Sequence, residues 1–134
     1  MAQKPTTAFS SPDVIAPPIG AYSHIAVVPK DYELVVLAGQ IGNSVDGVLP
    51  VDVETQYENA LSNIAKLLHS QKCTPADIVK INTYLVRPLD GDKIRGVRQR
   101  ILGDVKPPST MVYVPRLATL EILIEIEVWA ARRS

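Results

Sequence analysis

The chain has little of the chemistry that disulfides and metal centres need. Cys73 is its only cysteine, and His24 and His69 are its only histidines. A single cysteine excludes an internal disulfide and a cysteine-rich metal site. So few imidazole and thiolate ligands also argue against zinc, and we expect chemistry without a metal or cofactor. Cys73 follows a predicted helix end and is interpreted as a structural thiol.

The chain also lacks a net charge and a long apolar run. Fourteen basic residues balance fourteen acidic ones, so no long-range field attracts nucleic acid or an anionic membrane. Apolar stretches such as residues 34–38 are far shorter than the roughly 20 residues that span a bilayer. The first residues carry no apolar segment typical of a secretory leader. We therefore expect no nucleic-acid or membrane partner, and a cytoplasmic location.

The length of the chain is typical of one folded domain. A length of 134 residues allows one hydrophobic core without disulfides or metals. The N-terminal segment places prolines among serines and threonines, which favours extended, solvated backbone. We therefore predict a flexible arm over residues 1–16 and a single domain over residues 17–134.

Hydrophobic periodicity and capping residues predict the order of the elements. Two apolar, β-branched runs joined by a short loop predict a hairpin, and Thr74 before Pro75 predicts the start of a helical turn. Gly96 interrupts the helical spacing of the second helix. The expected elements are strands over 23–28 and 33–40, a helix over 52–71, the turn from Thr74, a strand over 78–86, a helix over 92–102, and strands over 109–114 and 119–131.

The last predicted strand has two unlike faces. One face is purely apolar and is expected to pack on the helices: Leu120, Ile122, Ile124, Ile126, Val128 and Ala130. The opposite face mixes carboxylates with large apolar groups: Glu121, Leu123, Glu125, Glu127 and Trp129. Such a mixture fits neither a dry core nor open solvent, and it indicates a partly buried surface such as a subunit interface with a cleft.

This element order predicts an α+β fold with an antiparallel or mixed sheet. Each helix has one apolar stripe to bury, so both helices are expected on one face of the sheet. The other face is then uncovered in a single copy. Its apolar members, including Trp129, predict self-association.

Six segments together resemble the reactive-intermediate deaminase family, also called the Rid or YjgF family. The resemblance spans about residues 17–132, in the same order and with similar spacing. The segments are IGAYSH at 19–24, LAGQIG at 37–42, DVETQYENALSNIAKLL at 52–68, DIVKINTYLV at 77–86, PPST at 107–110 and IEIEVWA at 124–130.

The resemblance implies a chorismate-mutase-like domain assembled as a homotrimer, with three clefts between subunits. Deaminating members of the family hydrolyse reactive imino or enamino acids to keto acids and ammonia without a metal or cofactor. That chemistry needs a positioned water, a carboxylate that moves its protons, and donors for the developing charge. A small molecule is therefore the expected partner.

The resemblance assigns candidate site residues position by position. Glu125 matches the first glutamate of the family's E-I-E motif and is the candidate for activating water. Tyr22 matches the tyrosine of G-P-Y-S, and Thr110 stands where relatives carry cysteine or threonine. Gly39 matches the glycine of S-G-Q-I, where the backbone approaches the ligand closely, while Ala38 replaces the serine.

The family's P-A-R-S-T segment differs here. Pro108 replaces the arginine that binds the substrate carboxylate in deaminating members, and Ser109 follows it. Such a charge-assisted contact contributes on the order of 1.5–3 kcal/mol, so its loss is expected to weaken imino-acid turnover roughly ten- to a hundredfold or more. Arg98 is either a solvated helix residue or a replacement cation, and His24 is either exposed or a ligand contact.

Three functions remain open at this point. The first is a cofactor-free enzyme that uses Glu125, Tyr22 and Thr110 on a reactive imine, enamine or related carbonyl compound. The second is an enzyme for a neutral intermediate of specialised metabolism, because Pro108 makes the cleft less cationic and Trp129 adds apolar surface. The third is a trimer that binds a small metabolite without turnover. A ribonuclease role has little support in a neutral chain without a basic and aromatic surface.

Overall fold

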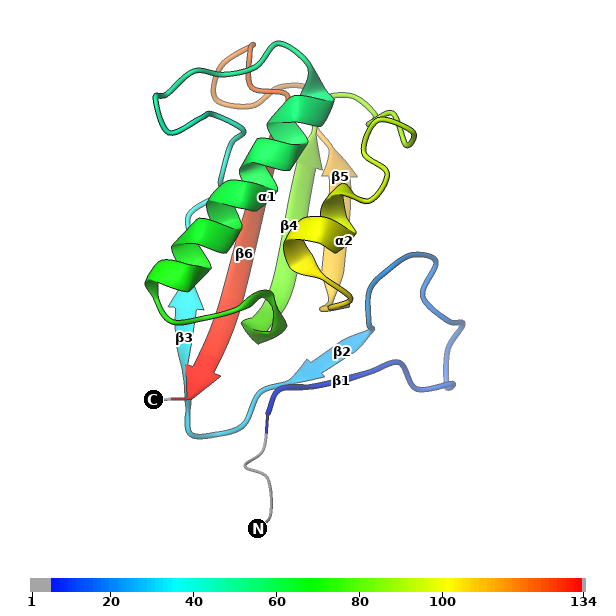
Figure 1. Ribbon diagram of the computed structural model, residues 1–134. Helices are drawn as coiled ribbons and strands as arrows, with labels where there is room; N and C mark the ends of the chain where they lie inside the picture. Colours follow the sequence, from blue (N-terminus) through cyan, green and yellow to red (C-terminus); the bar gives the residue numbers. More distant parts are fainter. Residues whose placement is uncertain (1–5, 134) are drawn as a thin grey trace.

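A four-stranded mixed sheet with both α-helices on one face forms the body of the described chain (Figure 1). The computed structural model describes residues 6–133. Its elements are β1 (Ala8–Ser10), β2 (Ile25–Val27), β3 (Tyr32–Val36), α1 (Val53–Ser70), the 3₁₀ turn η1 (Pro75–Asp77), β4 (Ile78–Leu85), α2 (Val97–Leu102), β5 (Ser109–Tyr113) and β6 (Ile124–Arg133). Within this part of the chain, no helix has the length and apolar character needed to cross a membrane.

The sheet has the order β3-β6-β4-β5 and confirms the predicted mixed α+β architecture. Strand β6 pairs antiparallel with both β3 and β4, while β4 and β5 run parallel. The C-terminal strand is therefore central, with a neighbour on each side. Because alternate residues of a strand point to opposite faces, β6 carries the core on one face and a second surface on the other.

Helix α1 forms where its sequence predicts it. The carboxylate of Asp52 caps the helix by accepting a hydrogen bond from the Thr55 N–H at 2.9 Å, which satisfies a backbone donor that would otherwise lack a partner. Beyond the C-terminal cap, Lys72 adopts a φ of 57°, and this left-handed residue ends the helix. On the apolar stripe of α1, Ile64 and Leu68 are fully buried in the core.

The segment before β6 is irregular and is anchored by a buried polar side chain. Gln56 of α1 is fully buried, and its amide donates to the carbonyls of Pro50 at 2.7 Å and Glu121 at 3.0 Å. Its carbonyl oxygen accepts from the Leu123 N–H at 2.9 Å. These three bonds tie α1 to the chain that enters the central strand.

Because this segment is irregular, the last strand is shorter at its start than the predicted strand over 119–131. The strand begins at Ile124, because residues before it form a turn with Ile122 N–H bonded to the Thr119 carbonyl. Strand alternation therefore does not extend back to Leu120, which is 72% exposed instead of buried. Leu123, predicted on the mixed face, is 7% exposed and belongs to the core.

The predicted hairpin between the first two strands is wrong. Strand β2 pairs antiparallel with β1, and the two form a separate two-stranded ribbon beside the sheet (Figure 1). Strand β3 pairs with β6 instead. Pro29, between β2 and β3, has no N–H to give to a ladder, and its carbonyl accepts from Tyr32 in a turn.

Part of the predicted N-terminal arm belongs to the two-stranded ribbon. Residues 8–10 of the predicted arm form β1 and pair with β2. Residues 1–5 of the arm lie outside the described part of the chain. The division into an arm over 1–16 and a domain over 17–134 otherwise stays a prediction.

The second helix is shorter than predicted. Residues 90–96 form turns, and α2 begins only at Val97 after Gly96. Gly96 has a φ of 76°, a left-handed conformation that glycine adopts readily but that cannot continue a right-handed helix. Gly96 was expected to interrupt the helix, and in the structure the helix begins directly after it.

Candidate functional site

The candidate site lies on the sheet face that the helices leave uncovered, which we call the outer face. On β6, Ile124, Ile126 and Val128 are buried under the helices, so the residues between them point outward. Strand register places polar side chains of three strands beside one another here. This outer-face cluster consists of Lys80, Asn82 and Tyr84 on β4, Thr110 on β5, and Glu125 and Glu127 on β6.

Glu125 packs directly against Gly39. A Cβ at position 39 would lie 2.0 Å from Glu125 Oε2 and 2.8 Å from its Cδ. Position 39 must therefore lack a side chain for the Glu125 carboxylate to occupy this place. The adjacent bridge between Gln40 and Ile126, with N–H to O distances of 2.7 and 2.9 Å, fixes the approach of this segment to β6.

The two carboxylates of the cluster have different surroundings. Glu127 Oε1 accepts hydrogen bonds from Asn82 Nδ2 and Tyr84 Oη, both at 2.9 Å. The bond from Asn82, followed by that from Tyr84, lowers the pKa of Glu127 below its usual value of 4.5. Glu125 accepts no hydrogen bond from any described residue, so its oxygens are available to water or a ligand.

A cation lies on the β5 side of the cluster. Lys80 Nζ donates to Thr110 Oγ1 at 2.9 Å. Pro108 precedes β5, and its carbonyl accepts from the Ile81 N–H at 3.0 Å. The structure thus gathers Glu125, Gly39, Thr110 and Pro108 around one face.

Apolar side chains border the cluster. Trp129 is 44% exposed and pairs with Val36, which is 57% exposed. Ala38 follows on the connection to Gly39 and is also exposed. Large apolar side chains that are exposed beside a hydrogen-bonded polar cluster are typical of a surface that another molecule covers.

Four other sequence candidates lie away from the cluster. Ser109 pairs with the buried Ile81 and so faces the helices. Arg98 Nη2 donates to the carbonyls of Ala21 and Val105, at 3.3 and 3.2 Å, on the helix side of the sheet. Tyr22 and His24 contact each other edge to face at 5.9 Å, beside β2.

Tyr22 and His24 are held within their own segment. The Ile19 N–H donates to Tyr22 Oη at 3.3 Å, and His24 Nε2 lies 2.9 Å from the Ala16 carbonyl oxygen. A single copy therefore does not bring Tyr22 to Glu125.

Three residues of the cluster were missed in the sequence: Lys80, Asn82 and Tyr84. The sequence pattern that could have identified them is a polar side chain at every second position of β4, which places all three on one face of the strand. Their roles become visible only with the strand register, because the register sets which residue of β5 and β6 each one meets.

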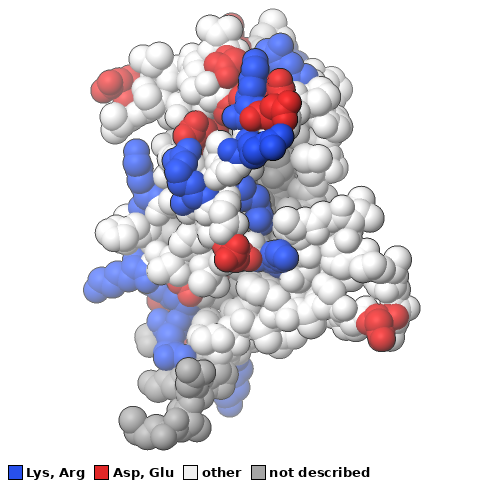
Figure 2. All heavy atoms as spheres, turned by 45° about the vertical axis from the view of Figure 1, so that its right-hand side comes forward, with Lys and Arg blue, Asp and Glu red and all other residues white. Residues whose placement is uncertain are grey.

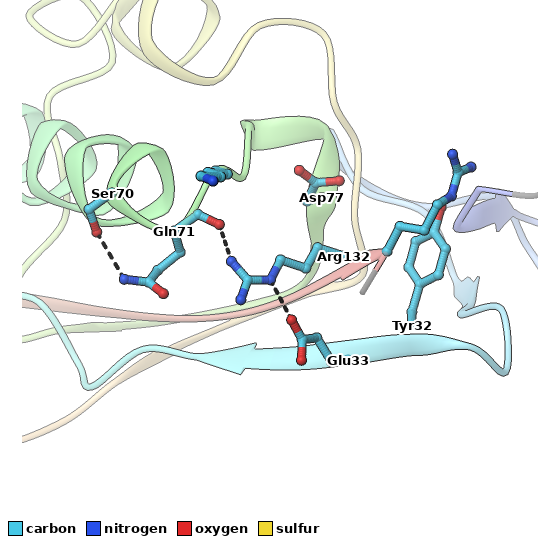
Figure 3. Close-up of a pocket in the computed structure, with 8 residues that line it drawn as sticks. Tyr32, Glu33, Ser70, Gln71, Asp77 and Arg132 are labelled. Atoms are coloured by element: carbon cyan, nitrogen blue, oxygen red, sulfur yellow. Dashed lines mark hydrogen bonds and ion pairs between the residues drawn. The ribbon is translucent and has the colours of Figure 1, made fainter.

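Surface hollows lie elsewhere on the described part of the chain. Figure 3 shows one of about 650 Å³ at the C-terminal end of α1, where Arg132 donates to Glu33 Oε1 at 2.8 Å and to the Gln71 carbonyl. This hollow contains the Arg132–Glu33 ion pair and lies at the opposite end of β6 from Glu125. A hollow of about 720 Å³, lined in part by Phe9 and Val105, separates the ribbon from the body.

Charges on the side of α2 and β5 are mixed in sign. Figure 2 shows basic and acidic groups close together over this region. Ion pairs join Arg95 with Asp92 and Arg100 with Glu58. The projecting part of the molecule that contains β1 and β2 carries few charges, since Asp13 is the one Asp, Glu, Lys or Arg between residues 6 and 28. We call this part the ribbon lobe. This lobe is an apolar projection next to a polar body.

The fold and outer face define a class: an α+β domain with a carboxylate-bearing, half-apolar sheet surface. The family model described as Endoribonuclease L-PSP matches residues 14–132. A RutC family protein from Pyrococcus horikoshii is 33% identical over 116 residues, covering 82% of this chain and 86% of that protein.

Solved structures agree with this assignment. A Rid-family protein of unknown function from Yersinia pestis matches with a TM-score of 0.82 and 25% identity, over 95% of this chain and 99% of that one. A YjgF-family member from Mycobacterium tuberculosis matches with a TM-score of 0.60 and 25% identity, over 93% and 98%. The chain belongs to the Rid/YjgF family, which supports a role in processing small molecules.

Proposed function

We propose that this protein is a cofactor-free hydrolase of small reactive imines or enamines, with Glu125 as its acid-base residue. The observation that carries the proposal is the difference between two carboxylates on one strand. Glu127 is occupied by Asn82 and Tyr84, whereas Glu125 lies against Gly39 with its oxygens available. Glu127 is therefore a structural group, and Glu125 is the carboxylate free to move protons.

The reaction requires only water and a proton carrier. Glu125 removes a proton from water as the water oxygen bonds to the imine carbon, and the carbon–nitrogen double bond becomes single. Glu125 returns that proton to the nitrogen, which gives a carbinolamine. It then carries the hydroxyl proton to the nitrogen, and the carbon–nitrogen bond breaks to release ammonia as the carbonyl forms. The overall balance is imine plus water to carbonyl compound plus ammonia, and positioned proton transfer of this kind contributes roughly 10²–10⁴-fold.

The proposal includes a homotrimer with clefts between its copies. A neighbouring copy would cover Val36 and Trp129, which are 57% and 44% exposed, and so exclude water from Glu125. The apolar, nearly uncharged ribbon is suited to packing on such a neighbour. This arrangement supplies Tyr22 to the Glu125 of another copy, which a single chain does not do.

The test compares Glu125→Gln with Glu121→Gln. An amino-acid oxidase generates the imine, and its decay is followed with and without each protein. We expect Glu125→Gln to lower turnover by about 100-fold or more and to keep the oligomeric mass. The control position Glu121 is exposed and outside β6, so Glu121→Gln retains turnover. Equal rates for the two variants would refute the role of Glu125.

A further inference from the structure

Lys80 is a half-buried cation without a carboxylate partner in residues 6–133. Its ammonium group donates to Thr110 Oγ1 at 2.9 Å. An ammonium has three N–H donors, so two remain for another acceptor. An ammonium with unused donors, on the same face as Glu125, can bind an anionic ligand group.

Strand register places Lys80 beside Pro108. Strands β4 and β5 are parallel with Ile81 opposite Ser109, and Ile81 N–H bonds to the Pro108 carbonyl at 3.0 Å. One residue earlier on each strand, Lys80 and Pro108 are neighbours. The apolar proline ring offers no hydrogen-bond donor there, and Lys80 is the cation of the outer-face cluster.

The acidic groups of the face are held away from Lys80. Its ammonium reaches toward β5, whereas β6, which carries both glutamates, lies on the other side of β4. Glu127 is bonded to Asn82 and to Tyr84, one and two outward positions further along β4. Glu125 pairs with Tyr84 in register and lies against Gly39.

The cluster therefore has a cationic end and a carboxylate end. Thr110 and Glu125 are separated by two strand spacings and by two residues along the strands, roughly 12 Å between backbone positions at about 4.8 Å per strand and 3.3 Å per residue. This separation matches the length of a substrate of a few carbons together with a water molecule. One end of such a substrate would meet Lys80, and its reactive carbon would lie toward Glu125.

We propose that Lys80, together with the Thr110 hydroxyl, binds the carboxylate of the substrate. This inference rests on the proposed function and specifies its substrate class as small imino or enamino acids instead of neutral compounds. Lys80 is a specificity residue: it binds the anionic group and takes no part in proton transfer.

Binding of unreactive product-like probes tests the proposal independently of turnover. The probes are 2-oxobutanoate and its uncharged analogue 2-oxobutanamide, measured by calorimetry with the full oligomer. We expect Lys80→Met to weaken 2-oxobutanoate binding about tenfold or more, since a charge-assisted bond is lost. Binding of the amide is unchanged, and Lys80→Arg retains most of the affinity for the acid.

Two further variants separate charge recognition from folding. Lys66→Met removes an exposed lysine of α1 and is expected to leave both affinities unchanged. Pro108→Arg added to Lys80→Met restores acid binding by returning a cation to the same place. Equal affinity of the wild type for acid and amide, or unchanged acid binding in Lys80→Met, would overturn the proposal and favour a neutral ligand.

The two proposals fail in different ways. If Glu125→Gln keeps turnover while Lys80→Met loses acid binding, the assignment of Glu125 is wrong and the anion site stands. If Glu125→Gln loses turnover while Lys80→Met binds the acid normally, the hydrolase stands and the carboxylate is held elsewhere.

Discussion

Gly39→Ala should remove activity while the fold remains. The new Cβ would lie 2.0 Å from Glu125 Oε2 and 2.9 Å from its Cγ, so the carboxylate has to move. Gly39 is not among the described glycines with positive φ, so alanine fits its backbone. The obstacle is the end of a flexible side chain, and displacing it costs about 1 kcal/mol. For a chain of this size that corresponds to a fall in Tm of roughly 3–6 °C.

Loss of the correct Glu125 position should cost about 100-fold in imine hydrolysis. Gly42→Ala is the matched control, because its Cβ would lie 2.2 Å from the Gln56 carbonyl oxygen and 2.3 Å from Gln56 Cα. That clash is with buried helix backbone, so we expect about 3 kcal/mol or more of destabilisation. Thermal melting followed by circular dichroism measures the loss of stability, and the coupled imine assay measures the loss of turnover. A fully active Gly39→Ala protein would refute the role assigned to this contact.

Two further predictions concern stability. Gln56→Ala leaves three backbone groups unpaired and should lower the free energy of unfolding by about 3 kcal/mol or more. The control is Gln99→Ala at an exposed position, which should lower it by less than about 0.5 kcal/mol. Denaturant unfolding measures both values. Because Asn82 and Tyr84 lower the pKa of Glu127, their stabilisation is present above its unfolded pKa and is lost as pH falls through the folded value. The Asn82→Ala/Tyr84→Phe variant should therefore lose less stability than the wild type between about pH 6 and pH 3; an identical loss would contradict this.

The elements predicted correctly are those that local residues define. Asp52 at the cap and regular apolar spacing specify α1, and Thr74 with Asp77 forms the capping box that starts η1. The alternation of Ile124, Ile126 and Val128 identifies the buried face of β6. Each signal lies within one turn or one strand of the chain.

The errors came from partners far away in sequence. The partner of β2 is β1, although proximity along the chain favoured a hairpin with β3. Leu123 continues the alternating pattern, yet its N–H bonds to Gln56, 67 residues away. Pattern alone contains no information on such a bond.

The site was predicted in part for the same reason. Glu125, Gly39 and Thr110 were identified by resemblance, and the structure places them on one face. Lys80 was missed because its meaning depends on the register between β4 and β5. Tyr22 was assigned to the same site, but its segment lies on the helix side, where Arg98 contacts Ala21.

The most direct measurement asks whether Tyr22 of one copy works with Glu125 of another. Tyr22→Ala and Glu125→Gln are each expected to be inactive. When the two chains carry different tags and are purified together as a mixed trimer, about one third of wild-type activity should return, because one cleft of the three in each mixed trimer receives both intact residues. No recovery in a verified mixed oligomer would show that the cleft is not shared in this way.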